Sequence, residues 1–388
     1  MSAQPSKKAP VGTGVVKPQS LAWGHHIREQ LLERILQLPV GTRLPTEVEL
    51  AREFGVSRLT AYKVMAELQH DGLVRRQKGR GTFVSRREVE IVSGRVVARR
   101  DQVIFAYPQW FSYDIWAKVD CAAQLALHRK LNLVDFKITS ETDFSSLARL
   151  VKEKTAAEGV ILIPPGGQLG RKEVEVFGRF GIPVVILVFS EYAAPQPNVF
   201  CVAKDHFKAG YLMAQYLTEN GHQHLGYIAN EPPQDDKVRM MEGLKQGLYE
   251  HNLRLKNLRR IGDEVGAGGN SMAAGYHYTR EMLAGGQRPT ALIYDSMPGC
   301  MAGLRALYEA GLSVPGDMSV IVNDDDAGRE EFLYPPITTV RIDRMEMLRT
   351  AMDIITDEEA RSAGKTVTVD VCLDERASVG PPPAAPQL

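Results

Sequence analysis

Short β-rich runs alternate with helical stretches from Val103 onward, and this alternation restricts the fold more than any other feature of the sequence. Strands that alternate with helices usually form a parallel sheet with helices on both faces. The predicted strands cover residues 103–107, 133–138, 160–163, 184–189, 225–228, 291–294 and 319–322. The predicted helices between them cover residues 115–130, 144–154, 172–180, 207–220, 238–251, 271–284 and 300–310. Seven such units predict an α/β fold of two doubly wound lobes.

The first hundred residues follow a different pattern, dense in helix and turn signals, and therefore predict a separate domain. The chain has 388 residues, which is too long for one ordinary core. We expect a disordered arm over 1–19, a small helical domain over 20–86, a linker over 87–101, a two-lobed domain over 102–379 and a disordered tail over 380–388.

The net charge is zero, but the charges are unevenly distributed. Residues 1–100 contain 18 Lys and Arg against 9 Asp and Glu, while the remainder contains 29 against 38. A basic region ahead of an acidic one favours a polyanionic partner for the first domain. A solvated charged face would give the same balance, so charge alone does not decide between them.

Composition limits the classes of protein that fit. A hydrophobic fraction of 44% and a charged fraction of 24% are ordinary for a soluble globular protein. The apolar runs are too short to cross a bilayer, and the polar N-terminus does not resemble a secretory signal. Four widely spaced cysteines suit a reducing compartment. We therefore expect a cytoplasmic protein with no membrane partner.

Three helices are expected in the first domain. Ser20 caps the first, whose apolar residues recur at helical spacing from Ile27 to Leu38. Thr46 caps the second and forms a capping box with Glu49. Ser57 caps the third. Two helices joined by a tight glycine turn predict a helix-turn-helix, whose second helix enters the major groove of DNA.

The third helix and the hairpin after it supply the expected DNA contacts. Arg58 matches the O6 and N7 acceptors of guanine, while neighbouring polar side chains suit phosphates or base edges. Residues 73–84 predict a two-stranded wing whose glycine-bearing, basic tip approaches the DNA backbone or minor groove. The predicted DNA-binding residues are Arg43, Thr46, Ser57, Arg58, Thr60, Tyr62, Lys63, Lys78, Gly79 and Arg80.

The same residues resemble a known family. The stretches 41–51, 54–58 and 72–84 are similar to the winged helix-turn-helix of the GntR family. The resemblance implies operator contacts for Ser57, Arg58, Thr60 and Gly79. Val48 and Tyr62 depart from the family pattern, which affects the expected operator sequence rather than DNA binding itself.

The rest of the chain resembles another family. Residues 202–210, 216–228, 304–320, 335–340 and 374–378 are similar to the LacI/GalR effector domain, which shares the type I periplasmic-binding-protein fold. A GntR-type domain ahead of a LacI-type domain resembles the arabinose-repressor subgroup. The resemblance implies a sugar-type effector. We hypothesise in addition that the second domain forms a homodimer, which holds two DNA-binding domains at the half-sites of a near-palindromic operator.

Ligands of open parallel sheets bind at the carboxyl ends of strands. After the first strand, Gln109 suits sugar hydroxyls, and Trp110 or Phe111 suits stacking on a sugar, although aromatic residues there are also common in cores. Asn323 and Asp324 follow a later strand and suit hydroxyl groups. The family resemblance adds Arg239 and Asp295 as polar clamps, with ordinary surface ion pairs as the alternative for both.

An enzymatic function fits the sequence less well. Residues 266–271 resemble a dinucleotide loop only superficially, and the pairs His25-His26 and His222/His224 have no further metal ligands nearby in the sequence. We therefore predict a regulator that is not an enzyme and needs no cofactor or metal. The main expectation is a repressor of carbohydrate-utilisation genes; an activator, or a sugar-binding or sugar-metabolising protein with an incidental basic domain, remains the alternative.

Overall fold

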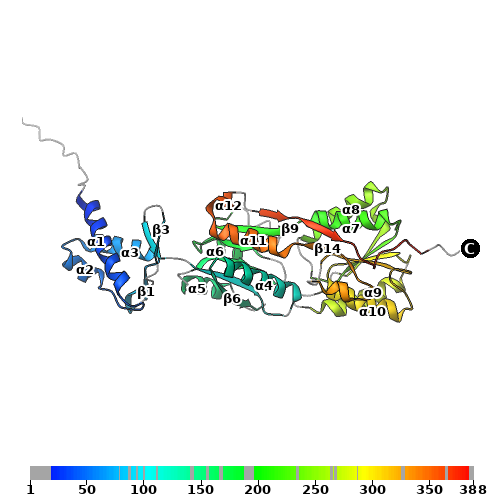
Figure 1. The fold of residues 1–388 in the computed structure, drawn as a ribbon, viewed down its shortest axis with the longest axis horizontal. Helices are drawn as coiled ribbons and strands as arrows, with labels where there is room; N and C mark the ends of the chain where they lie inside the picture. Colours follow the sequence, from blue (N-terminus) through cyan, green and yellow to red (C-terminus); the bar gives the residue numbers. More distant parts are fainter. Residues whose placement is uncertain are drawn as a thin grey trace, which may run out of the picture. The chain divides into compact units, whose positions relative to one another are not determined.

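The chain forms two units, residues 1–100 and 101–388, in a computed structural model (Figure 1). We call them the head and the body. The structure describes residues 19–77, 79–85, 89–92, 95–98, 101–110, 112–139, 144–153, 157–165, 169–187, 196–232, 236–262, 265, 269–285, 287–324, 328–362 and 366–383.

The head contains the three predicted helices and the wing. Its helices are α1 (Gln19–Gln37), α2 (Glu47–Glu53) and α3 (Arg58–His70), and the wing strands are β1 (Val74–Gln77) and β2 (Gly81–Val84). Helix α1 begins one residue before Ser20, so Ser20 lies inside the helix and is not its cap. The apolar stripes of α1 and α3 meet in one core, which includes Ile27, Leu31 and Val64.

A second hairpin lies within the segment that we predicted as a linker. Strand β3 (Val89–Val92) pairs antiparallel with β4 (Arg95–Ala98). The charged, β-branched composition of this segment is therefore that of a small two-stranded sheet.

The body contains two six-stranded sheets, as the strand–helix alternation predicts. The amino lobe has the strand order β15-β9-β8-β7-β5-β6, and the carboxyl lobe has the order β11-β10-β12-β13-β14-β16. All described pairings are parallel except that of β14 with β16. Most of these strands are buried along their length, as expected for sheets covered on both faces.

The amino lobe is built from the first part of the body and from a later return. Its elements are β5 (Gln102–Pro108), α4 (Tyr113–His128), β6 (Asn132–Ile138), α5 (Ser145–Glu153), β7 (Ala157–Leu162), α6 (Arg171–Phe177), β8 (Val184–Ile186), β9 (Val199–Lys204), α11 (Arg344–Thr356), α12 (Glu358–Ser362) and β15 (Thr366–Val369).

The carboxyl lobe occupies the stretch between. Its elements are α7 (His206–Glu219), β10 (Leu225–Ala229), α8 (Asp236–Glu250), β11 (Leu258–Gly262), α9 (Ser271–Ala284), β12 (Ala291–Tyr294), α10 (Met297–Glu309), β13 (Ser319–Val322), β14 (Thr338–Ile342) and β16 (Val371–Asp374). Helices α7 and α8 lie side by side (Figure 1), and a Cβ on Gly243 would stand 1.9 Å from the Phe207 carbonyl oxygen. Glycine at this position therefore permits the close approach of the two helices.

The chain crosses between the lobes three times, each time at an aspartate. Asp205 follows β9 and caps α7, and Asp343 follows β14 and caps α11. Asp370 lies between β15 and β16, where its carboxylate accepts from Lys208 Nζ at 2.5 Å. The Asp205 amide donates to the Val369 carbonyl at 3.0 Å, which ties the first crossing to the third.

The packed chain continues past the predicted end of the body. Gly380, which we assigned to a disordered tail, donates its amide to Ser319 Oγ at 3.0 Å. The buried His222 ring lies 2.9 Å from the Gly380 carbonyl oxygen and 2.8 Å from Thr290 Oγ1. His222 is therefore a hydrogen-bonded packing residue, as expected from the sequence.

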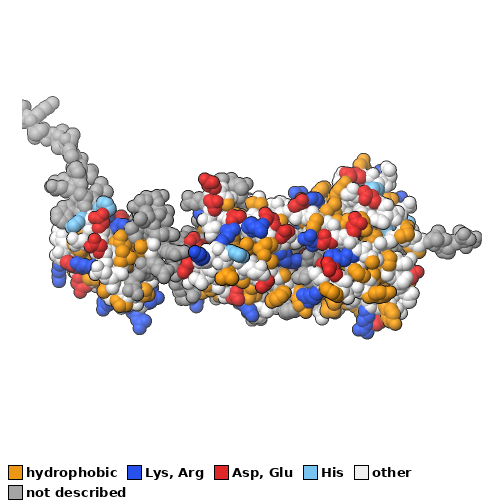
Figure 2. Space-filling view, viewed as in Figure 1, with side chains coloured by type: hydrophobic (Ala, Val, Ile, Leu, Met, Phe, Trp, Pro, Cys, Tyr) orange, Lys and Arg blue, Asp and Glu red, His pale blue; other side chains and the backbone are white. Residues whose placement is uncertain are grey.

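None of the helices in the described part of the chain combines the length and apolarity needed to cross a bilayer. On the face drawn in Figure 2, basic and acidic side chains of the body are intermixed.

Candidate DNA-binding face and effector site

Two caps define the helix-turn-helix as predicted. Thr46 Oγ1 accepts from the Glu49 amide, and the Glu49 carboxylate accepts from the Thr46 amide at 2.7 Å. Ser57 Oγ accepts from the Thr60 amide at 3.1 Å. Gly55, with φ of +62°, makes the turn between the helices. Both cap hydroxyls are already engaged inside the protein, so Thr46 is better placed to orient α2 than to contact DNA.

The first turns of α3 expose the side chains that we predicted for base and phosphate contacts. Arg58, Tyr62 and Lys63 are exposed, while Ala61 and Val64 face the core. Leu59, which sequence analysis did not select, is 63% exposed beside Arg58. Its position on the polar face of the helical pattern was the available signal. An exposed apolar side chain at the start of such a helix suits the methyl group of thymine.

Tyr62 is held by the wing. The Arg76 guanidinium lies over the Tyr62 ring at 4.9 Å, and its Nη2 atom is 2.9 Å from Glu47 Oε1. Arg76 therefore connects α2, α3 and β1. Because Arg76 is committed to these contacts, the neighbouring Arg75, exposed on β1, is the cation that this strand presents to solvent. The alternation of buried Val74 and exposed Arg75 could have revealed it in the sequence.

Arg43 belongs to the wing. It bridges to Phe83 in antiparallel register, and the amide of Leu44 donates to the Thr82 carbonyl at 2.8 Å. Gly81 has φ of +115°, and a Cβ there would lie 3.0 Å from Arg43 Nε. Gly79 and Arg80 are exposed at the tip, while Lys78 lies outside the described residues.

A polar cluster lies at the carboxyl ends of β10 and β12 in the carboxyl lobe. Asp295 is 7% exposed and pairs with Lys237, with Nζ and Oδ2 2.7 Å apart. Tyr227 donates its hydroxyl to the same carboxylate. Asn230 accepts from the Asp295 amide at 3.1 Å. Burial raises the pKa of Asp295, against the opposing effect of the Lys237 charge.

Glu231 extends this cluster. Its carboxylate accepts from Ser296 Oγ at 2.5 Å, and Ser296 in turn accepts from Asn230 Nδ2 at 2.7 Å. Burial raises the pKa of Glu231. A Cβ on Gly299 would stand 2.2 Å from Asn230 Nδ2, so the glycine allows the amide to lie under α10. Such a set of buried donors and acceptors at strand ends is typical of a polar ligand site.

The structure does not bring Arg239 into this cluster. Its side chain is 58% exposed and pairs with Glu242, one turn along α8, at 3.1 Å. Lys237, two residues earlier on the same helix, supplies the cation beside Asp295 instead. Arg239, which lies four residues before Gly243 where the family usually has three, is therefore on the exposed face of α8.

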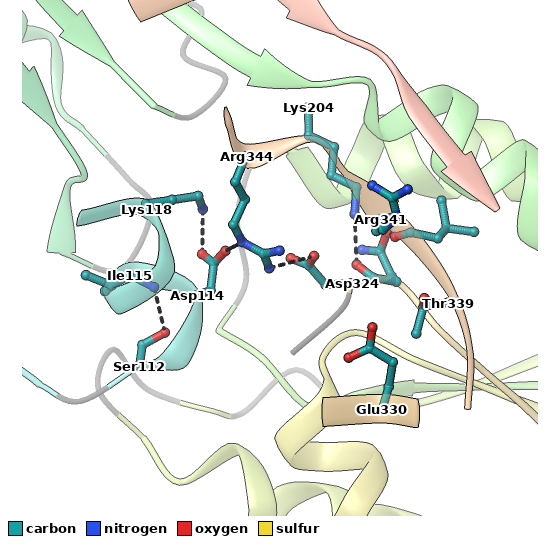
Figure 3. A network of polar contacts seen from close by, with 12 residues as sticks. Ser112, Asp114, Ile115, Lys118, Lys204, Asp324, Glu330, Thr339, Arg341 and Arg344 are labelled. Atoms are coloured by element: carbon teal, nitrogen blue, oxygen red, sulfur yellow. Dashed lines mark hydrogen bonds and ion pairs between the residues drawn. The ribbon is translucent and has the colours of Figure 1, made fainter. Parts of the chain in front are cut away.

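The two other predicted residues of this lobe follow the neighbouring strand β13. The backbone amide of Asn323 donates to the Tyr294 carbonyl at 2.9 Å, so Asn323 lies close to the Asp295 cluster. Asn323 Oδ1 is buried and has no hydrogen-bond partner among the described residues. Asp324 pairs with Arg344, as Figure 3 shows, with Oδ1 and Nη2 3.3 Å apart.

Near the end of β5, the predicted residues are only partly described. Gln109 is exposed, and its amide donates to the Ile138 carbonyl at 2.9 Å. Trp110 is half-buried, and Phe111 lies outside the described residues. Whether these side chains contact a ligand stays a prediction.

Comparison with known proteins follows the same division of the chain. Residues 24–84 match the family described as bacterial regulatory proteins, gntR family, and residues 214–379 match the periplasmic binding protein-like domain. The chain therefore carries a region that matches the gntR family followed by a region that matches a periplasmic binding protein-like domain, in the order that the sequence resemblance implied.

Particular relatives share this second domain. The chain is 27% identical over 209 residues to the HTH-type transcriptional repressor PurR of Actinobacillus pleuropneumoniae, and the match covers 54% of this chain and 58% of that protein. The fold of a LacI-family regulator from Enterococcus faecium with bound ribose matches 72% of this chain and 99% of that one, at a TM-score of 0.60 and 20% identity. The dimeric Lac repressor matches the same shares at a TM-score of 0.60 and 19% identity.

Proposed function

We propose that this chain is a DNA-binding transcription regulator, a repressor of carbohydrate-utilisation genes that a sugar-type effector releases from its operator. The observation that carries the proposal is the capped helix pair whose second helix exposes Arg58 at its first turn, next to a wing with exposed Arg43, Arg75 and Arg80. This arrangement suits insertion of α3 into the major groove while the wing cations contact phosphates.

The effector proposal rests on the strand ends of the carboxyl lobe. Asp295, Lys237 and Asn230 offer donors and acceptors in a buried setting, and Asn323 Oδ1 is an acceptor for which the described residues supply no donor. A neutral, hydroxyl-rich molecule can satisfy such groups without bringing a net charge. Two structural neighbours, LacI-family regulators with bound ribose and with bound glucose, agree with this class of ligand.

The regulatory scheme requires two heads. We propose a homodimer held by the body, which places two α3 helices at half-sites of a near-palindrome, one helical turn or a multiple apart. A coupling of about 1–3 kcal/mol between effector and operator sites is enough for a five- to 150-fold change in DNA affinity. The chain acts as a cytoplasmic protein with no catalytic step in this scheme.

Arg58→Ala tests the DNA-reading role. Duplexes bound by the full-length protein are first selected from a random library, and affinities are then measured at fixed salt. We expect Arg58→Ala to weaken binding to the selected duplex by about 1–3 kcal/mol and to relax the base preference at one base pair, because a bidentate guanine contact is lost.

Arg52→Ala is the matched control, since Arg52 is an exposed cation on α2 rather than on α3. It should alter affinity for all duplexes slightly and leave the base preference intact. If Arg58→Ala changes affinity no more than this control and keeps the parent's preference, α3 is not the reading helix.

A further inference from the structure

The first turn of α4 lies beside contacts between the lobes that involve charged side chains. Ser112 caps α4, and its Oγ accepts from the Ile115 amide at 3.4 Å. Of the next two residues, Tyr113 contacts Arg329 of the carboxyl lobe, and Asp114 pairs with Arg344 at the start of α11 (Figure 3 shows Asp114). Gln109 and Trp110, predicted at the effector site, lie immediately before this turn in the chain.

Asp114 takes part in an ion chain that crosses between the lobes. Its Oδ1 is 2.9 Å from Arg344 Nε, and its Oδ2 is 2.5 Å from Lys118 Nζ. Arg344 begins α11 directly after the second crossing, and its Nη2 reaches Asp324 of the carboxyl lobe at 3.3 Å. The Arg344 side chain is only 8% exposed. Figure 3 shows Arg344 between the two carboxylates.

Tyr113 makes a separate contact between the lobes. The Arg329 guanidinium lies 3.0 Å from the centroid of the Tyr113 ring. Arg329 belongs to the short helix Arg329–Phe332 of the carboxyl lobe, between β13 and β14. A guanidinium above an aromatic ring is attracted to the ring face, and the attraction is stronger where water is displaced. Tyr113 thus contacts the carboxyl lobe directly, while Asp114 is linked to it only through Arg344.

These charges balance one another. Asp114 and Asp324 face Arg344 and Lys118, so breaking one pair leaves a partly buried charge without its partner. Burial alone would raise the pKa of Asp114, but the charges of Lys118 and Arg344 hold it well below its usual range. Asp114 therefore stays ionised and available to the ion chain over the working pH range of most proteins.

We propose that Tyr113 and Arg344 form a latch that holds the two lobes together before any effector binds, with Asp114 orienting Arg344. Because Asp324 is also a predicted effector-binding residue, the latch connects effector binding to lobe position. That connection rests on the proposed function, whereas the latch itself does not. Asp114 is a positioning residue in this proposal, since it acts through Arg344.

The test measures the distance between the lobes without DNA or effector. Spin labels are attached to Glu175→Cys on α6 and Lys245→Cys on α8, in a chain that also carries Cys121→Ser and Cys372→Ser. Cys201 and Cys300 are buried and stay unlabelled. Labelled chain is mixed with excess unlabelled chain, so that pulsed electron paramagnetic resonance reports distances within one protomer.

We expect one main distance in the parent, and a new population at longer distance in Asp114→Asn and in Arg329→Gln. Arg344→Gln should do the same and Arg344→Lys should restore part of the parent distribution. Circular dichroism identifies any variant that fails to fold, and the remaining variants then decide the outcome.

The matched control is Asp353→Asn. It removes the Asp353–Arg129 pair, 2.6 Å apart, which joins the same two helices α4 and α11 within the amino lobe. Its distance distribution should equal that of the parent. The latch is refuted if folded Asp114→Asn and Arg329→Gln also keep the parent distribution, or if the control shifts as they do. Neither outcome depends on whether the head binds DNA.

Discussion

Single polar residues at fixed offsets predict much of the local structure of this chain, because a cap satisfies backbone groups within its own turn. Thr46, Glu49 and Ser57 take the roles that their spacing predicts. Asn323 was predicted in a similarly local way, since it directly follows a buried strand, whereas Asp295 was predicted from the family resemblance. Lys237 was missed because its partner Asp295 is 58 positions away in the sequence, and only the folding of the carboxyl lobe brings them together.

The contrast between Lys237 and Arg239 gives a prediction at this scale. A sugar that binds the body at 100 times its dissociation constant stabilises the folded protein by about 2.7 kcal/mol. We expect Asp295→Asn to lose most of this stabilisation, because the ligand meets an amide where the paired carboxylate stood. Arg239→Ala should keep it, because Arg239 pairs only with Glu242 among the described contacts of its side chain.

The measurement is the shift in melting temperature of each full-length variant across a panel of mono- and oligosaccharides. The unliganded melting curves verify that each variant folds. An Asp295→Asn protein that responds to the effector as fully as the parent would remove Asp295 from the proposed site.

At the scale of elements, the strand–helix alternation locates most of the body. The predicted strands 291–294 and 319–322 coincide with β12 and β13, and helix 271–284 coincides with α9. The strands β9, β11, β14, β15 and β16 were not predicted. All of them except the edge strand β11 lie next to the lobe crossings, where short strands follow one another without the helix that gives the alternation its period.

The head depends on a buried ion pair that no sequence pattern indicated. Arg28 of α1 and Asp71 at the end of α3 are each 8% exposed, with Nη2 and Oδ2 2.7 Å apart. Removing one partner leaves the other charge buried, so Asp71→Ala should destabilise the head by about 3 kcal/mol. Urea unfolding of the full chain, followed in the head by protection of α3 amides from hydrogen exchange, measures this.

Arg34→Ala is the control for that prediction. The Arg34–Glu53 pair also starts from α1, but its side chains are 44% and 38% exposed. An exposed pair contributes about 0–1 kcal/mol, so this variant should unfold almost as the parent does. Equal losses of stability in the two variants would show that burial of the Arg28–Asp71 pair is not what makes it important.

At the scale of the whole molecule, the sequence separates head from body through charge and periodicity, but it does not show how the two lobes of the body are interleaved. The amino lobe takes α11 and β15 from a stretch more than 130 residues beyond β9, and such returns depend on long-range packing. The seven predicted units therefore indicate the number of lobes, but they do not show to which lobe each strand belongs.

The central claim is that the head binds duplex DNA through its cations and α3. The most direct measurement is the affinity of the full-length protein for its library-selected duplex between 50 and 200 mM salt. Since the proposed dimer would present two copies of Arg43, Lys63, Arg75 and Arg80, we expect affinity to fall by about 10³-fold or more over this range. Affinity that is absent, or that does not change with salt, would contradict the account.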